Sequence, residues 1–542
     1  MATPFDLPNL DSEQDRVRAL GVKNSGVKEF SFDRVFPVNR LNSQDGSLVG
    51  GKVLEFRIRS DSNRWINWRE TKIQATFEVK VLDAGTEAEA GGGFTDDPDY
   101  MAQISQDTRI VACPLHATFD GGMSYTLNSQ LVENNTHPHQ SAMIALHTRT
   151  DAFDVQTTGS GSLMSLEKTT NYPNLRAAYV AETAATHGQD RRLVNPKVAV
   201  LQDFFDSTTG EDKATFQVAE PLLGLASLQH GYFAPPGDHR IELTVANGFE
   251  NHLFFNHLSG TGDLFDAISS EPFPTTSADK QRLASTLIVN LKDIELSVCM
   301  VSPAGASYIP RGVALKFSPY MITHIPIQSR NVLTSCVVPP ATRAVYLWMR
   351  QQKASGPDHD FEELGLATMG INIHDHSNAT KKVGYFEQLE VQLGSSIAGR
   401  YTQMNPRKGL MQRPWNDYLS TIGKPNALRG SQLTYGEYCG VANEQINGAP
   451  ATGEGSNAIV ATVAGQTHVI MPGRTCGGFY MRIINPSGNL SNMLQIRGDL
   501  NTDISADSQL ELVVCAVSDR LLQCEYAEGQ EIPVSTRVTD IL

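Results

Sequence analysis

Hydrophobic and polar residues alternate with a period of two in many short segments of the chain. In residues 52–59, Leu54, Phe56 and Ile58 alternate with charged residues, and residues 72–80 repeat the pattern. Such alternation places one row of side chains in a core and the other in water, as in an antiparallel sheet. The same pattern returns later in the chain, at residues 241–245, 294–300, 389–393, 458–464 and 510–517. We therefore expect a protein built mainly from antiparallel strands.

Helical periodicity is rare by comparison. Short helices are indicated around residues 141–150, 174–182 and 416–422. No series of alternating strands and helices runs along the chain, which argues against a parallel α/β enzyme fold. The sequence thus predicts an all-β protein with a few short helices.

Long polar segments separate the predicted strands. They cover residues of about 83–108, 133–200 and 396–457 and are rich in Gly, Asn, Thr and Pro. Connections of this length are uncommon in a compact domain unless they have a function or structure of their own. A jelly roll tolerates such insertions, because its eight strands already enclose a complete core. We therefore expect two consecutive eight-stranded jelly rolls with long loop insertions.

The chain length fits two large β-domains. At about 150 residues per domain, 542 residues would give three or four domains, but all-β domains often reach about 200–250 residues. A Pro-, Gly- and Ser-rich segment at residues 302–311 follows a finished strand, and strand patterns resume at Val313. The predicted division is an N-terminal arm (1–44), a first jelly roll (45–302), a linker (303–312), and a second jelly roll with the C-terminal segment (313–542).

The composition is that of an acidic folded protein. Charged residues make up 19% of the chain, below the roughly 25% of an ordinary globular protein, which argues against disorder and coiled coil. The formal net charge is −15, and nearby acids balance the basic residues among the first forty. A dedicated nucleic-acid-binding protein, or an RNA-virus coat protein with a basic arm, is therefore disfavoured.

The seven cysteines are widely spaced and include no CxxC pair. This pattern predicts neither a disulfide framework nor a zinc site, and it suits a reducing compartment. Cys299 and Cys515 lie in apolar strand patterns and are expected in the core. The first twenty residues contain acids and no apolar segment, and no stretch approaches the roughly 18 apolar residues that span a membrane. We expect a protein that works, or at least is made, in the cytosol or nucleus.

Several groups of histidines and carboxylates are candidate metal ligands. His374 and His376 form a His-x-His pair, but the Glu that a cupin-type site needs shortly afterwards is missing. His137 and His139 flank Pro138 in a segment whose proline and asparagines favour a loop. Two acidic clusters, Asp96-Asp97-Pro98-Asp99 and Asp358-His359-Asp360 with Glu362-Glu363, do not follow the EF-hand order. No metal-binding residue and no cofactor is predicted.

The motifs of nucleophilic catalysis and phosphate binding are absent from the sequence. There is no GxSxG, HExxH, GxxxxGK[ST] or strand-linked GxGxxG. Trp65 and Trp68 have two interpretations: a platform that stacks on a sugar or nucleotide, or packing at the end of a sandwich or at a subunit interface. We assign no catalytic residue and expect a protein that is not an enzyme. A carbohydrate-binding or carbohydrate-active jelly roll is the alternative.

Several segments also follow one another in a distinctive order. An alternating strand leads to the segment with Trp65 and Trp68, then to a second long strand and an acidic, glycine-rich loop. Residues 109–116 and 123–128 follow, ending in the tight-turn sequence Leu127-Asn128-Ser129. Residues 220–244 contain a leucine-rich segment, an aromatic pair, a Pro-Gly turn and an alternating strand, and residues 339–348 read as a proline turn into a strand.

This order resembles that of double-jelly-roll major capsid proteins of eukaryotic double-stranded DNA viruses. The likeness is to the Polinton-like virus, adintovirus and virophage group within the adenovirus-type capsid lineage. It covers order and spacing over residues 45–400, with Ser129 in place of the family's turn glycine. The family's Asn-Pro-Phe-Asn-Phe sequence has no counterpart after Gln352.

The resemblance implies a structural protein of the virion. Family members form homotrimers whose six jelly rolls make a pseudo-hexameric capsomer of an icosahedral shell. The implied partners are further copies of the chain, neighbouring capsomers, penton proteins, minor capsid or cement proteins and, in some members, an internal membrane, with no sequence-specific nucleic-acid binding. Synthesis in the host cytoplasm and assembly there or in the nucleus are also implied.

Overall fold

The structure is a computed structural model. It describes residues 27–39, 50–61, 64–81, 108–111, 115–149, 198–200, 205–206, 211–229, 233–234, 236–247, 254–257, 287–303, 312–339, 342–351, 385–405, 410–421, 459–463, 466–470, 478–483, 492–501, 510–527 and 533–541.

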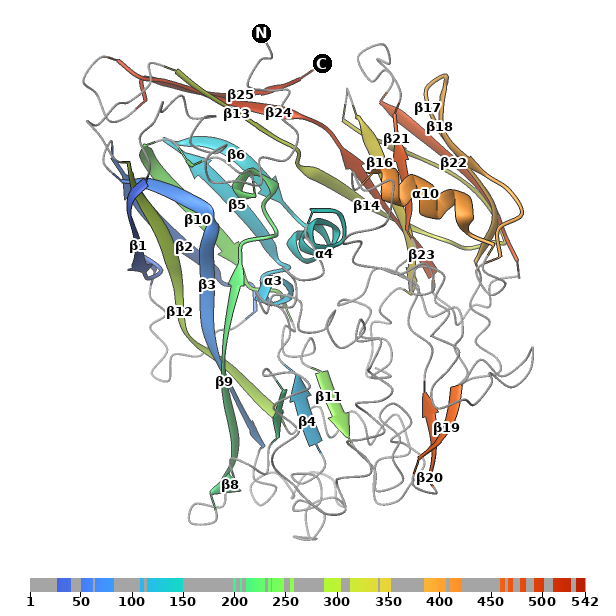
Figure 1. The fold of residues 1–542 in the computed structure, drawn as a ribbon, viewed down its shortest axis with the longest axis horizontal. Helices are drawn as coiled ribbons and strands as arrows, with labels where there is room; N and C mark the ends of the chain where they lie inside the picture. The colour runs from blue at the N-terminus through green and yellow to red at the C-terminus, as the bar shows by residue number, and fades with distance from the viewer. Residues whose placement is uncertain are drawn as a thin grey trace.

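The first half of the chain forms two facing antiparallel sheets, seen on the left of Figure 1. The strands of one sheet are β1 (Val27–Val35), β12 (Leu287–Pro303), β3 (Trp65–Val81), β9 (Glu211–Pro221) and the two-residue β8 (Phe205–Asp206), in that order. The strands of the other are β2 (Val53–Ser60), β10 (Gly237–Thr244), β5 (Gly122–Leu127) and β6 (Gln130–Asn135). Their inner faces enclose one hydrophobic core.

The second half repeats this arrangement on the right of Figure 1. One four-stranded sheet has the order β14 (Tyr320–Pro326), β23 (Leu510–Val517), β16 (Ala344–Gln351) and β21 (Phe479–Arg482). The other has the order β15 (Asn331–Val337), β22 (Met493–Leu500), β17 (Phe386–Leu393) and β18 (Ser396–Tyr401). A second core lies between them.

The two halves share one topology. When the main strands of each half are ranked along the chain, one sheet has the order first, eighth, third, sixth and the other second, seventh, fourth, fifth. This interleaving, in which the last strand inserts between the first and third, is the jelly-roll arrangement. The prediction of two consecutive eight-stranded jelly rolls is therefore confirmed.

Burial along the strands explains why these segments pair as they do. In β2, Leu54, Phe56 and Ile58 are buried and alternate with more accessible residues. Strand β23 is buried at every position, as expected for an inner strand that is covered on both faces. Cys299 and Cys515 are buried free thiols, as predicted.

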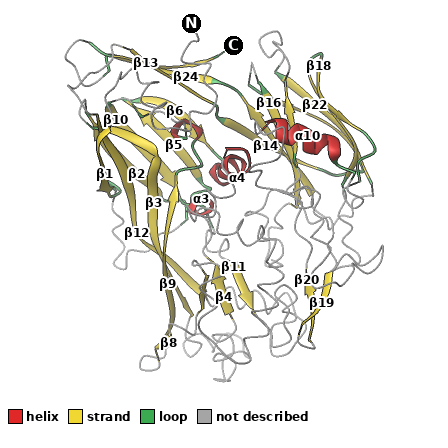
Figure 2. Ribbon diagram, viewed as in Figure 1, coloured by secondary structure: helices red, strands yellow, loops and turns green. Residues whose placement is uncertain are grey.

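The helices of the described residues are short (Figure 2). They are α3 (Leu115–Thr118), α4 (Pro138–Arg149), the 3-10 helix η3 (Ala226–Leu228) and α10 (Gln412–Thr421). The helices predicted around 141–150 and 416–422 correspond to α4 and α10, whereas residues 174–182 lie outside the described residues. The loops predicted at residues 133–200 and 396–457 begin too early in the sequence. Residues 133–135 are the end of β6, and residues 396–401 form β18.

A further sheet of the second half lies over the first roll. It consists of β13 (Gly312–Phe317), β24 (Arg520–Glu525) and β25 (Ser535–Asp540), at the top of Figure 1. Four of its residues belong to the core of the first roll, together with Tyr526, which follows β24: Leu315, Phe317, Leu522 and Cys524. Conversely, Ala142 and Ile144 of α4 belong to the core of the second roll. The halves thus complete each other's cores.

The remaining strands lie at the opposite end of the molecule (Figure 1). They are β4 (Thr108–Val111), β7 (Val198–Val200) and β11 (Phe254–His257), which form one small sheet, and the hairpin β19 (Ile459–Val463) and β20 (Gln466–Ile470). The small sheet joins three separate insertions of the first roll, which follow β3, β6 and β10. The insertion after β10 was not among the predicted long loops.

The chain passes from β12, which ends at Pro303, to β13, which begins at Gly312, so the strands stop and restart where the sequence indicated. Strand β1 lies within residues 1–44, the predicted arm, and pairs with β12 along its length. The division into residues 1–44, 45–302, 303–312 and 313–542 stays a prediction.

Candidate interaction surfaces

A polar cluster in the first core contains a serine and a histidine, the residue types that serve as nucleophile and base in many enzymes. His239 lies in β10, with its Nε2 2.9 Å from Ser60 Oγ and its Nδ1 2.9 Å from the Tyr125 hydroxyl. The ring of Trp68 meets His239 and Tyr125 edge-on at 5.7 and 5.8 Å. All of these side chains are buried, and burial raises the pKa of the Tyr125 hydroxyl. Because a substrate cannot reach them, the cluster serves to order the core.

The tryptophan pair does not form a binding platform. Both residues lie within β3, and both are buried. Trp68 belongs to the first core, whereas Trp65 packs in a small separate cluster with Phe233, Cys299 and Val301. The sugar- or nucleotide-stacking interpretation is therefore wrong, and the packing interpretation is confirmed. One continuous strand contains both residues, and not a segment between two strands as the order of patterns suggests.

His137 and His139 lie at the joint between the two halves. His137 precedes α4, and its ring stacks on that of His324 in β14 at 4.7 Å and 24°. Gln140 Oε1 is 2.8 Å from His324 Nε2, and Glu511 Oε1 is 3.3 Å from His324 Nδ1. His139 is buried. No sequence signal links these residues, because the contact joins α4 to a strand of the other roll.

The structure does not describe the other candidate metal ligands. His374, Asp375 and His376 lie outside the described residues, as do the acidic segments 96–99 and 358–363. Within the described ranges, no group of three or more His, Cys, Asp or Glu residues could hold a metal ion.

Two buried carboxylates support the short helices η3 and α3. Glu133 accepts hydrogen bonds from the backbone N–H groups of Ala226 and Ser227, at 3.1 and 2.7 Å. Glu220 accepts one from the N–H of Leu115 at 2.7 Å. Each carboxylate therefore satisfies the free N–H groups at the start of a short helix, which is a structural role.

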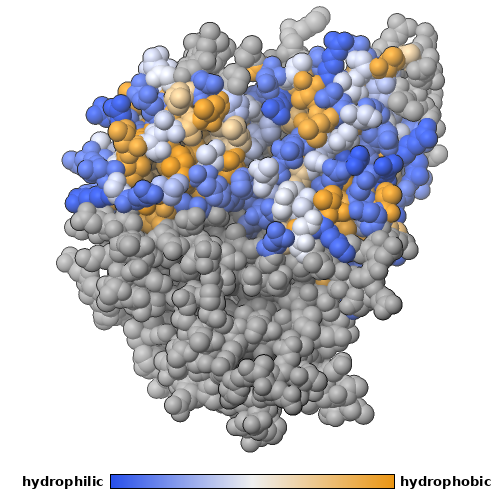
Figure 3. Space-filling model, turned by 180° about the vertical axis from the view of Figure 1, so that it is seen from behind, coloured by the Kyte–Doolittle hydropathy of each residue, from blue (hydrophilic) through white to orange (hydrophobic). Residues whose placement is uncertain are grey.

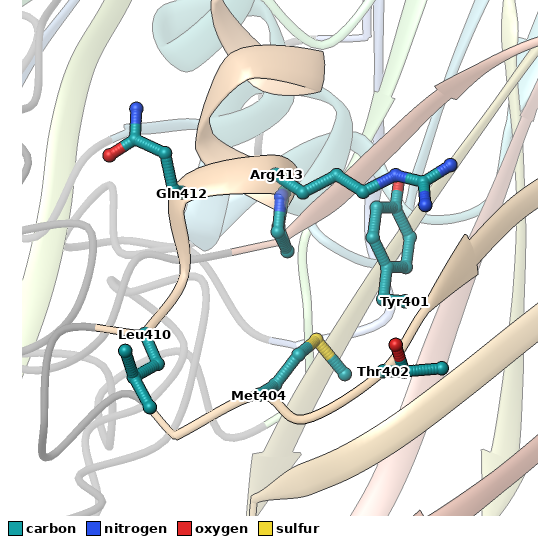
Figure 4. A pocket seen from close by; sticks show the side chains of 7 residues that line it. Tyr401, Thr402, Met404, Leu410, Gln412 and Arg413 are labelled. Atoms are coloured by element: carbon teal, nitrogen blue, oxygen red, sulfur yellow. The ribbon is translucent and has the colours of Figure 1, made fainter.

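A cavity of about 340 Å³ opens at the start of α10 (Figure 4). It is lined by residues from the end of β18 to the first turn of the helix: Tyr401, Thr402, Met404, Leu410, Gln412, Arg413 and Pro414. The Arg413 guanidinium lies 5.8 Å from the ring centre of Tyr401, whose hydroxyl donates to Asp417 at 2.8 Å. The recess suits apolar side chains with a neighbouring negative charge.

Exposed apolar side chains gather on both rolls. Seen from behind, the broadest apolar patch lies on the left, over the second roll (Figure 3). The exposed apolar residues of the outer sheet of this roll are Leu333, Val337, Ile397 and Met493, and Leu333 is 76% exposed. On the first roll, β1 and the residues after it expose Phe30, Phe32, Phe36 and Val38. Contiguous exposed apolar surface usually marks an interaction site.

None of the described helices is long and apolar enough to cross a membrane.

The fold is shared with viral proteins of known structure. A chain in the 3.5 Å cryo-EM structure of the Sputnik virophage superimposes with a TM-score of 0.53, covering 95% of this chain and 89% of that one at 12% identity. The mavirus major capsid protein superimposes with a TM-score of 0.50, covering 94% and 90% at 10% identity. No protein-family model and no curated protein sequence matches the chain. At these identities the likeness concerns the fold, which is the double jelly roll.

Proposed function

We propose that the protein is the major capsid protein of a double-stranded DNA virus or virus-like element. The observation that carries this proposal is the repetition of one jelly roll, strand for strand, within a single chain. The shared fold and nearly full-length coverage of the mavirus major capsid protein support it. Two rolls in one chain let three copies present six similar units, which suits a pseudo-hexameric tile.

The surface chemistry supports an assembling protein rather than an enzyme. The exposed apolar residues of both rolls lie among charged side chains, as in interfaces that form between folded subunits. The carbohydrate alternative depended on Trp65 and Trp68, and their burial removes its main support. We therefore assign the protein to the virion, with further copies of itself as its first partners. Penton and minor capsid proteins, and an internal membrane, belong to the same proposal.

The test is the mass of the purified full chain. Light scattering after size exclusion should give three times 59.2 kDa, and electron micrographs at high concentration should show hexagonal tiles. A monomer at every concentration, with no lattice under varied salt and pH, would count against the capsid role.

A further inference from the structure

The joint between the two rolls is visible within one chain. It forms where the segment after the fifth strand of the first roll meets the first strand of the second roll. His137 and Gln140, at the start of α4, contact His324 in β14 through ring stacking at 4.7 Å and a 2.8 Å hydrogen bond. Ala142 and Ile144 continue this contact into the second core.

The second roll has an equivalent of the α4 side of this joint. Helix α10 follows β18, the fifth strand of its roll, as α4 follows β6. Both helices have a proline in their first turn, Pro138 and Pro414. In the first roll the start of the helix contacts β14 through His137 and Gln140. In the second roll it borders the cavity, where Leu410 is 55% exposed.

The first roll has an equivalent of the β14 side. Strand β1 is the first strand of its roll and lies at the edge of its sheet, as β14 does in the second roll. Arg34 holds β1 in place, because its Nε donates to both oxygens of the buried Glu295 at 3.0 and 2.8 Å. Phe30 and Phe32 nevertheless remain exposed, Phe32 by 59%. An ordered strand thus presents aromatic rings to the surroundings.

We propose that β1 of one copy packs against the cavity at the start of α10 of a second copy. The contact continues the joint observed between the two rolls of one chain, with the next roll supplied by another molecule. Phe30 and Phe32 would pack against Leu410, the exposed apolar residue at the rim of the cavity. The contact joins two different surfaces, so its repetition forms a ring of copies when the rotation between them closes. This inference rests on the proposed capsid function.

Photo-crosslinking tests the contact directly. Phe32 is replaced by p-benzoyl-phenylalanine in unlabelled protein, which is mixed with ¹⁵N-labelled wild type and irradiated. We expect peptides in which residue 32 of one isotope is joined to residues 401–414 of the other. The same replacement at Leu131, a 50% exposed leucine of β6 in the opposite sheet, is the control and should not label this segment. Crosslinks from residue 32 to any other surface would overturn the proposal.

Substitutions test the same contact by mass measurement over a dilution series. We expect Phe32→Asp and Leu410→Asp each to raise the concentration needed for the oligomer at least tenfold, and Leu131→Asp to leave it unchanged. Both target residues are exposed, so circular dichroism should stay that of the wild type. If wild type forms trimers and neither variant weakens them, this interface is wrong while the capsid role stands. If wild type never oligomerises, the proposed function itself fails.

Discussion

The turn between β5 and β6 contains two residues in the left-handed region. Asn128 has a φ of 49° and Ser129 a φ of 65°, as a two-residue hairpin turn of the I′ type requires. Asn128 tolerates this conformation, and its Oδ1 accepts the backbone N–H of Asp238 at 2.9 Å. Serine does not adopt this conformation as readily as asparagine, because its Cβ makes a positive φ unfavourable.

Replacing Ser129 by glycine should therefore stabilise the protein. Glycine adopts a positive φ without the Cβ penalty, so we expect Ser129→Gly to raise the free energy of unfolding by about 0.5–1 kcal/mol. Denaturant titration followed by fluorescence measures the change. Ser129→Ala keeps a Cβ and should give no gain. An equal gain in both variants would show that the backbone conformation is not the cause.

The hydroxyl of Tyr125 should contribute to stability through His239. Tyr125→Phe retains the ring but leaves His239 Nδ1 without its hydroxyl partner in a buried site. We expect a loss of about 1–3 kcal/mol, seen as a lower Tm. Ser124→Ala removes a 3.0 Å hydrogen bond to Glu242 at a part-buried position of the same strand and should cost less. A Tm for Tyr125→Phe at or above that of Ser124→Ala would contradict the role given to the cluster.

At the level of elements, β3 shows both the strength and the limit of sequence patterns. The alternation in residues 72–80 predicted its C-terminal part correctly. Its N-terminal part was missed, because Arg69 and Glu70 interrupt the apolar pattern. Both are exposed and lie in the strand, where the pairing with β12 shifts in register. The neighbours β9 and β12 were unpredictable as partners, since alternation fixes which face is buried and not which strand pairs with which.

The sheet of β13, β24 and β25 was likewise hidden in the sequence. Its strands alternate like any others, and nothing in Leu522 or Cys524 indicates that they pack against the first roll rather than the second. The candidate surfaces were missed for a related reason. Phe30 and Phe32 lie in a segment without a clear core pattern, and their exposure depends on which strand covers them.

The thiol of Cys524 can report whether β24 is packed against the first roll. Burial raises its pKa from 9.0 to about 11, so the neutral thiol is favoured in the folded protein. Alkylation by iodoacetamide at pH 8 should then be about a hundredfold slower than in urea, and the rate should rise as the pH approaches 11. The raised pKa also links folding stability to pH, because the thiol ionises more readily in the unfolded chain than in the folded protein. The stability that the neutral Cys524 thiol contributes is fully present below pH 9 and is lost as the pH rises through 11.

Mass spectrometry of the peptide that contains Cys524 measures this rate separately from those of the other thiols. The protein in urea at the same pH is the control. Equal labelling rates in both conditions at pH 8 would mean that β24 is not held against the first roll.

At the scale of the whole molecule, the two rolls exchange core residues. Leu522 and Tyr526 from the end of the chain enter the first core, with the Tyr526 hydroxyl donating to the carbonyl of Pro236 at 2.8 Å. Ile144 of α4 enters the second core in return. Each roll has its own complete set of strands, but neither encloses its core without the other half.

Separating the halves should therefore expose apolar surface on both. We expect residues 1–307 alone to be insoluble or to unfold at a much lower Tm, and to be rescued by co-expression with residues 308–542. Co-purification through a tag on one half measures the association. A first half that is soluble alone, with a cooperative transition at the Tm of the intact chain, would contradict the shared cores.

The shared first core also has a consequence for how the protein folds during translation. Strand β12 inserts between β1 and β3, and Leu522 and Tyr526 complete the same core more than 200 residues later. The ribosome must therefore release almost the whole chain before the first roll can close. Such distant pairings slow folding and leave apolar strands open to aggregation in the meantime. We expect the nascent chain to depend on chaperones until its last strands leave the ribosome. The first roll is thus translated first but is among the last parts of the protein to fold completely.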